Sequence, residues 1–169
     1  MSLEDLVGTR IPPRVVTVER GPVVDFSSAV KDERSEYRSL AAARSAGFDR
    51  IPTPPTFAFV APNKGSFVDD QPEVPSDAVA LVELIAALRD GREGMILHGA
   101  EDFTYHGPVC VGDTFDVTGY VESAQTKPGT PEQPGMSVLV VRTDFQRAGT
   151  DEVAVTTRST FLFRPARSK

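Results

Sequence analysis

The spacing of apolar residues changes along the chain, and this change predicts which segments form helices and which form strands. Residues 14–19 are short and rich in β-branched side chains, which favours a strand that ends before Gly-Pro at 21–22. Apolar residues then recur at intervals of three and four over 23–41, which predicts two short helices with a break near residues 32–35. Gly47 suits the C-terminal cap of the second helix.

The next segment combines prolines with a short apolar run. Residues 51–55 contain three prolines, and the apolar residues 57–60 follow them. A run of this length is compatible with the start of a helix or with a short buried strand, because periodicity does not separate the two. In either case Pro62 is expected to end the element.

A further helix is predicted beyond a loop. Residues 63–75 are polar and contain proline and glycine, which indicates a loop, and Ser76 or Asp77 can cap the helix that follows. Residues 79–88 are apolar around nearly the whole circumference of a helix. A helix of this kind is buried on all sides, so we expect it at the centre of the fold.

The second half of the chain is rich in strands. The predicted strands cover residues 95–106, 114–124, 136–147 and 152–164, with hairpin connections at 111–114 and 128–135. Four consecutive strands predict an antiparallel meander. Together with the early strand and the buried helix, they predict an α+β domain in which a curved antiparallel sheet wraps a central apolar helix, the hot-dog fold. A sheet with helices on one face in a different order is the alternative.

The chain is predicted to be one domain that pairs with another subunit. Its 169 residues suffice for a single core, and no repeat or linker divides residues 1–169. A single open sheet leaves long edge strands exposed, and pairing with a second subunit commonly covers such edges. We therefore expect a dimer.

Composition and charge exclude several classes of protein. With 40% hydrophobic and 25% charged residues, the chain is expected to be globular, neither a disordered segment nor a membrane protein. A net charge of -6 disfavours nucleic-acid binding. One Cys and two His provide neither an internal disulfide nor a zinc site, and no cofactor is expected. The acidic start lacks the features of a signal peptide, which favours a cytoplasmic location.

Short motifs occur in a characteristic order at residues 26–32, 43–47, 54–57 (Pro-Pro-Thr-Phe), 97–99 (Leu-His-Gly), 105–109 (Tyr-His-Gly-Pro-Val) and 112–114 (Gly-Asp-Thr). In order and spacing they resemble the MaoC-like acyl dehydratase and hydratase family. Within it they resemble the N-terminal-type, FAS1-like dehydratase domain, which forms the first half of two-domain hydratases and the smaller subunit of heterodimeric dehydratases. The resemblance runs roughly from residue 11 to residue 164.

The resemblance implies an enzyme component that acts on acyl thioesters. The implied substrate is an acyl chain on coenzyme A or acyl carrier protein, and the implied reaction adds water to a 2-enoyl chain or removes it from a 3-hydroxyacyl chain. The implied assembly is a homodimer, or a heterodimer with a catalytic MaoC-like subunit. No basic cluster in the sequence distinguishes coenzyme A from the carrier protein.

The resemblance also implies catalytic positions, which this chain fills only in part. Active relatives carry a motif similar to Asp-x-Asn-Pro-x-His, in which carboxylate and imidazole move protons to and from water. Here Asp32 occupies the Asp position and Tyr37 stands at the His position, where a phenol is a poor substitute near neutral pH. The alternatives are that Asp32 caps a helix and that Tyr37 is a core aromatic residue.

Substrate-binding residues are predicted at two further motifs. Pro55, Thr56 and Phe57 are expected to line the thioester end of the pocket, or alternatively to reverse the chain before a core residue. His98 and Gly99 are predicted to bind substrate, with a structural histidine as the alternative. Strand alternation places His98 on one face and Leu97, Glu101, Phe103 and Tyr105 on the other, unless Gly99 forms a bulge that shifts the phase.

Two further functions remain open at this point. The absent catalytic histidine favours a non-catalytic subunit that binds acyl chains or serves as a scaffold. Glu83, a lone carboxylate in the apolar helix, is compatible with a hot-dog thioesterase, although an exposed glutamate is the simpler interpretation. Cys110 is expected to be a buried thiol, and His106 to lie at an exposed strand end.

Overall fold

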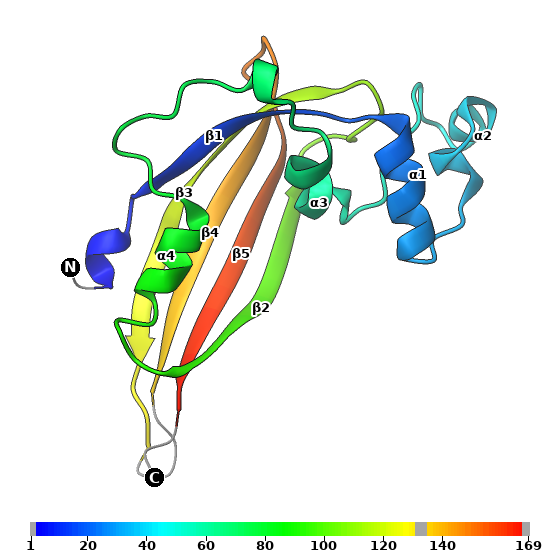
Figure 1. The fold of residues 1–169 in the computed structure, drawn as a ribbon. Coiled ribbons are helices and arrows are strands. Elements are labelled where there is room, and N and C mark those ends of the chain that lie inside the picture. Colours follow the sequence, from blue (N-terminus) through cyan, green and yellow to red (C-terminus); the bar gives the residue numbers. More distant parts are fainter. Residues whose placement is uncertain (1–2, 131–134, 167–169) are drawn as a thin grey trace.

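A computed structural model describes residues 3–130 and 135–166, in which short helices accompany one five-stranded antiparallel sheet (Figure 1). The strands are β1 (Arg10–Thr17), β2 (Gly94–Tyr105), β3 (Thr114–Lys127), β4 (Met136–Arg147) and β5 (Val153–Pro165). The α-helices are α1 (Arg20–Ala29), α2 (Leu40–Ser45), α3 (Phe57–Lys64) and α4 (Leu81–Ala87), and 3₁₀ turns cover Glu4–Leu6, Ser35–Tyr37 and Val68–Asp70. The predicted α+β hot-dog architecture is confirmed.

The order of the strands differs from the predicted meander. The sheet runs β1-β3-β4-β5-β2, so β3, β4 and β5 form consecutive hairpins, but β2 pairs with β5 and not with β3. β1 already occupies the other side of β3, where Val15 pairs with Asp116, and β2 therefore takes the free edge of β5. The segment at 111–114 is thus not a hairpin connection, although Gly112 makes a turn there with φ of 90°. Of the 128–135 connection, residues 131–134 lie outside the described residues.

The apolar run after the prolines forms a helix. α3 extends from Phe57 to Lys64 and includes Pro62, so the expectation that this proline ends the element is wrong. Pro62 lies in the last turn, where its missing N–H removes a single intrahelical hydrogen bond. The N–H of Gly65 closes the helix on the carbonyl of Ala61 at 2.9 Å.

The helix predicted over residues 79–88 is shorter and less buried than expected. α4 begins after Ala80 without a side-chain cap, and residues 76–77 form a turn well before it, so the predicted cap is wrong. Leu84 and Leu88 are each 1% exposed, whereas Val82 is 72% exposed. α4 therefore presents one apolar face to the sheet and is not buried on all sides in the single chain.

Two hydrophobic clusters lie along the sheet. One joins α1 and α3 to the sheet through residues such as Val23, Phe57, Phe115, Phe145 and Val155. The other joins α4 and the first 3₁₀ turn to the opposite end of the strands through Leu6, Leu84, Leu88, Leu139 and Phe163. The stretch of sheet between the two clusters is the floor of a cavity.

Candidate functional site

A large cavity lies on the sheet between α3 and the start of α4. It has a volume of about 510 Å³. Its apolar lining residues include Ile11, Phe59, Leu81, Phe145 and Phe161, and its polar ones are Arg14, Asn63, His98, Glu101, Thr143, Thr157 and Ser159. A smaller pocket of about 220 Å³ shares Phe59, His98 and Glu101 with it and extends to Thr56 and Phe103. The volume is typical of a small-molecule site.

His98 and Glu101 form a hydrogen-bonded pair in the wall that the two cavities share. The imidazole Nε2 lies 3.1 Å from Oε2 of Glu101, and the Glu101 side chain is only 12% exposed. The His98 ring is stacked between two phenyl rings, with centroids 5.3 Å from Phe59 and 5.2 Å from Phe161. The pair is therefore held in a fixed orientation by both ring packing and a hydrogen bond.

A β-bulge at Gly99 brings the two side chains together. His98 pairs with Phe161 and Ala100 with Thr160, which leaves Gly99 as an extra residue in β2. In a regular strand residues three apart point to opposite faces, and the bulge puts both on one face. A Cβ at Gly99 would lie 2.8 Å from Cδ1 of Leu162, so a larger residue here would force the Leu162 side chain to move.

The predicted bulge at Gly99 is confirmed, and it decides which residues share a face of β2. The unshifted alternation, which separated His98 from Glu101 and Phe103, is wrong, because all three line the same pocket.

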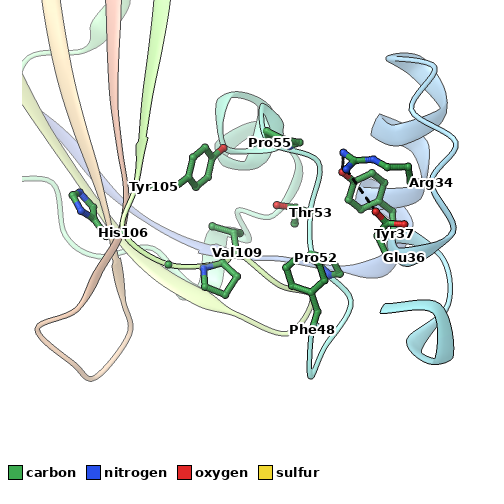
Figure 2. A pocket seen from close by; sticks show the side chains of 12 residues that line it. Arg34, Glu36, Tyr37, Phe48, Pro52, Thr53, Pro55, Tyr105, His106 and Val109 are labelled. Atoms are coloured by element: carbon green, nitrogen blue, oxygen red, sulfur yellow. Dashed lines mark hydrogen bonds and ion pairs between the residues drawn. The ribbon is translucent and has the colours of Figure 1, made fainter. Parts of the chain in front are cut away.

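A third pocket lies beyond the end of the sheet, beside the 3₁₀ turn that contains Tyr37 (Figure 2). It has a volume of about 430 Å³, and its lining includes Arg34, Tyr37, Pro55, Tyr105 and His106. Burial raises the pKa of Tyr105 to about 12. The Tyr105 ring points towards Pro55 across this pocket (Figure 2).

The predicted Pro-Thr-Phe motif lies between these pockets. Pro55 lines the third pocket, whereas the next residue, Thr56, lines the 220 Å³ pocket. Phe57 is buried and packs edge-on against Phe26, with ring centroids 5.6 Å apart. The motif thus divides two cavities, and Phe57 lines neither of them.

Asp32 and Tyr37 meet through an arginine that the sequence interpretation did not consider. Arg34 donates to both Asp32 oxygens, from Nε at 2.9 Å and from Nη2 at 2.8 Å, and also to the hydroxyl of Tyr37. Its guanidinium carbon lies 4.8 Å from the centre of the Tyr37 ring. These hydrogen bonds hold the pKa of Asp32 below its ordinary value, whereas burial raises the pKa of Tyr37.

This arrangement limits what Asp32 can do chemically. A carboxylate that is hydrogen-bonded to a guanidinium through both oxygens is a weak proton acceptor. Asp32 does not cap a helix either, since α2 is capped by the hydroxyl of Ser39, which accepts from the N–H of Ala42 at 3.4 Å. Tyr37 is buried with a satisfied hydroxyl, as the core interpretation predicts.

Three other candidate residues do not line the 510 Å³ cavity. Glu83 is exposed on α4 and is not among the residues that line the described pockets. Cys110 is a buried free thiol whose pKa is raised by burial. His106 is exposed, with Nε2 3.5 Å from the hydroxyl of Thr156.

Among the described residues, no helix combines the length and apolar character needed to span a bilayer. Within residues 3–130 and 135–166 there is also no cluster of three or more His, Cys, Asp or Glu side chains suited to a metal ion.

Sequence reasoning missed the roles of Arg34 and Glu101. The Asp-x-Arg spacing at 32–34 signals a local ion pair, because a guanidinium reaches a carboxylate two residues away. The Leu-His-Gly-Ala-Glu segment predicts the pair of His98 and Glu101 if Gly99 is taken as a β-bulge. The extra residue shifts the alternation of side chains, so that both residues point to the same face of β2.

Comparison with known proteins identifies relatives over nearly the whole chain. The profile of the family described as "FAS1-like, dehydratase domain region" matches residues 5–156. A UPF0336 protein of Saccharopolyspora erythraea is 25% identical over 164 residues, covering 95% of this chain and 90% of that protein. A UPF0336 protein of Streptomyces avermitilis is 30% identical over 129 residues, covering 75% of each.

Solved structures share the fold. The ChsH1-ChsH2 complex of Mycobacterium tuberculosis matches with a TM-score of 0.72 at 21% identity, over 94% of this chain and 86% of that chain. The HadBC (3R-hydroxyacyl-ACP dehydratase) complex of the same organism matches with a TM-score of 0.66 at 19% identity, over 95% and 99%. A MaoC-like dehydratase matches with a TM-score of 0.67 at 20% identity, over 98% of this chain and 44% of its own.

Proposed function

The chain belongs to the FAS1-like dehydratase domain family, and on that premise we propose that it is a subunit of an enoyl-thioester hydratase or 3-hydroxyacyl-thioester dehydratase. The family is of the hydratase and dehydratase type, and the proposal adds the substrate and the assembly. The substrate is an acyl chain carried as a thioester by coenzyme A or acyl carrier protein. Both carriers present the same phosphopantetheine arm, and the proposal covers both.

The observation that carries the proposal is the 510 Å³ cavity on the sheet. Phe59, Leu81 and Phe161 give it apolar walls suited to an acyl chain, and its polar groups other than Asn63 lie on the strands. Thr56 reaches the adjoining pocket, where it can donate a hydrogen bond to a thioester oxygen. An acyl chain in the large cavity therefore has its reactive end near polar groups.

A second hot-dog subunit completes the assembly. β2 is an edge strand of twelve residues, and its apolar side chains Met95 and Leu97 are 60% and 42% exposed. Such an edge offers unpaired backbone groups to another strand. Two structural neighbours are complexes of paired subunits, which supports pairing here as well. Arg34 donates hydrogen bonds to both carboxylate oxygens of Asp32. We therefore infer that a MaoC-like partner with an intact Asp and His supplies a catalytic pair.

The test is a hydration assay of the purified chain, alone and together with a MaoC-like chain that carries the intact motif, preferably one encoded by a neighbouring gene. Crotonyl and longer enoyl thioesters of coenzyme A and of acyl carrier protein are the substrates. We expect turnover in at least one setting, and a native mass at least twice that of the chain. Absence of turnover in both settings contradicts the proposal.

The Asp32–Arg34 ion pair favours a second candidate, a non-catalytic subunit that holds the acyl chain. Under this alternative the chain binds saturated acyl thioesters and has no turnover by itself. Hydration by the chain alone that Asp32→Ala abolishes would eliminate it. No observation favours a thioesterase, because Glu83 is exposed and lines none of the described cavities.

A further inference from the structure

We propose that His98 and Glu101 are an acid–base pair that exchanges protons with an acyl thioester bound in the large cavity. This inference rests on the proposed function and deepens it, because it gives the chain a proton-transfer group of its own. It differs from the Asp-x-Asn-Pro-x-His arrangement, whose positions in this chain are Asp32 and Tyr37 beside the third pocket.

The hydrogen bond, the bulge and the ring stacking together fix the geometry of the pair. An imidazole 3.1 Å from a carboxylate that is 12% exposed is poised for proton transfer, since the carboxylate orients the ring and stabilises its protonated form. The bulge at Gly99 is what brings the two groups onto one face of β2. Stacking between Phe59 and Phe161 then fixes the plane of the ring.

The surroundings place a substrate against this pair. Ser159 lies opposite Glu101 on β5, and Thr157 lies opposite Thr143 on β4, so hydroxyl groups form a stripe across an otherwise apolar floor. A ligand with an apolar chain and a polar centre matches this pattern. Arg14 and Glu101 are the charged residues that line the cavity, and Arg14 is exposed at its β1 side.

The chemistry balances with this pair alone. In hydration, His98 accepts a proton from water, the hydroxyl oxygen forms a bond to C3 of the enoyl chain, and the electron pair of the double bond moves to C2. The imidazolium then returns a proton to C2, so that water has been added and His98 is again neutral. Glu101 stabilises the imidazolium between these two transfers and acts as a positioning residue. Dehydration follows the reverse sequence.

The test separates the chemistry of His98 from its packing. His98→Phe retains an aromatic ring between Phe59 and Phe161 but removes both ring nitrogens. We expect it to unfold at the wild-type temperature and to lose about 100-fold in kcat, with KM changed by less than about threefold. Added imidazole should restore part of the activity to His98→Ala, whose truncation leaves a slot between the two phenyl rings.

A matched pair of variants tests the carboxylate. Glu101→Gln should lower kcat roughly tenfold, because it acts through His98. Asp102→Asn, the exposed neighbour in the sequence, should leave kcat unchanged. Assays use the chain in whichever setting supports turnover, alone or with its partner.

The outcomes distinguish the two proposals. Absence of turnover by the wild-type chain in both settings overturns the proposed function and this inference with it. Turnover that His98→Phe retains within threefold overturns the inference and leaves the proposed function standing. A loss confined to KM also overturns it, since that result assigns His98 to binding alone.

Discussion

Arg34 holds the carboxylate of Asp32 with two parallel hydrogen bonds, from Nε at 2.9 Å and from Nη2 at 2.8 Å. The planar guanidinium matches the geometry of a carboxylate, which a lysine at the same position would not do. The residue that the family resemblance marks as an acid or base is thereby an ion-pair partner. The proton-transfer group of a hydratase built on this chain must therefore be a residue other than Asp32.

Replacing Arg34 with Met should raise the pKa of Asp32 towards its ordinary value, because hydrogen bonds from Arg34 are the main cause of the lowered pKa. A lowered carboxyl pKa stabilises the folded state above the unfolded pKa, and this contribution is lost as pH falls through the folded pKa. Arg34→Met should therefore lose most of this contribution, because the N–H of residue 34 and the hydroxyl of Tyr37 still hydrogen-bond to Asp32. Carboxyl NMR titration measures the pKa. Arg38→Met is the control, since Arg38 donates to Ser28, and an equal shift in both variants contradicts the argument.

Gly99→Ala should destabilise the fold by about 1–3 kcal/mol, because a Cβ there would lie 2.8 Å from Cδ1 of Leu162. The companion change Leu162→Ala should offset part of this loss by removing the clashing atom. Gly21→Ala is the control, since a Cβ at Gly21 meets nothing within 4 Å. Urea unfolding compares the variants. If Gly99→Ala is as stable as wild type, the close contact does not require glycine.

The side chains on the buried face of α4 should contribute to the stability of the fold, and those on its exposed face should not. Leu84→Ala removes a side chain that is 1% exposed in the second hydrophobic cluster, and should cost about 2–5 kcal/mol in the free energy of unfolding. Val82→Ala, on the same helix but 72% exposed, should change it by less than about 0.5 kcal/mol. Chemical denaturation of the isolated chain gives both values. Equal losses would mean that the helix is buried all round after all.

The strands and the fold class could be predicted from the sequence, because β-branched residues and turn residues mark strands locally. The strand order could not. The residues of β2 and β5 that pair are 50 to 71 positions apart in the sequence. Both β1 and β2 could pair with the same side of β3, and no local sequence feature shows that β1 takes this place. The burial of residues 79–88 could not be predicted for a related reason. Composition shows that Val82 is apolar, but it does not show which side of the helix packs on the sheet.

The candidate site was predictable only in fragments. Tyr37, Thr56 and His98 all line pockets, but they do not share a single one. Tyr37 lines the third pocket, Thr56 lines the 220 Å³ pocket, and His98 lines both the 220 Å³ and the 510 Å³ cavities. The contact between Asp32 and Arg34 can be predicted from the sequence, because the two residues are only two positions apart. The joining of His98 with Glu101 depends on one extra residue in a strand, and a register shift of this kind reverses every inference from alternation.

Asp113 should be a structural residue. Its carboxylate is buried, accepts the N–H of Cys110 at 2.9 Å, and is paired with Arg50 and Arg147. Asp113→Asn should cost about 2–3 kcal/mol, because hydrogen bonds to a charged group are lost in a buried position. Glu122→Gln, which breaks a half-exposed pair with Arg158, should cost at most about 1 kcal/mol. Guanidinium unfolding at neutral pH tests the difference, and equal costs would refute it.

Tyr105 should ionise at a higher pH than an ordinary tyrosine, and its ionisation should change the free energy of unfolding. Burial raises its pKa to about 12 from an ordinary value of 10.0, so the folded state retains a proton that the unfolded chain releases. The free energy of unfolding should therefore decrease as pH rises from about 10 towards 12. Tyr105→Phe removes this dependence, and the difference between the two proteins isolates the contribution of one phenol. Ultraviolet absorbance follows the ionisation directly, because the chain has three tyrosines and Tyr105→Phe removes one of them. A phenol that ionises near 10.0 in the folded protein would show that the third pocket leaves Tyr105 open to water.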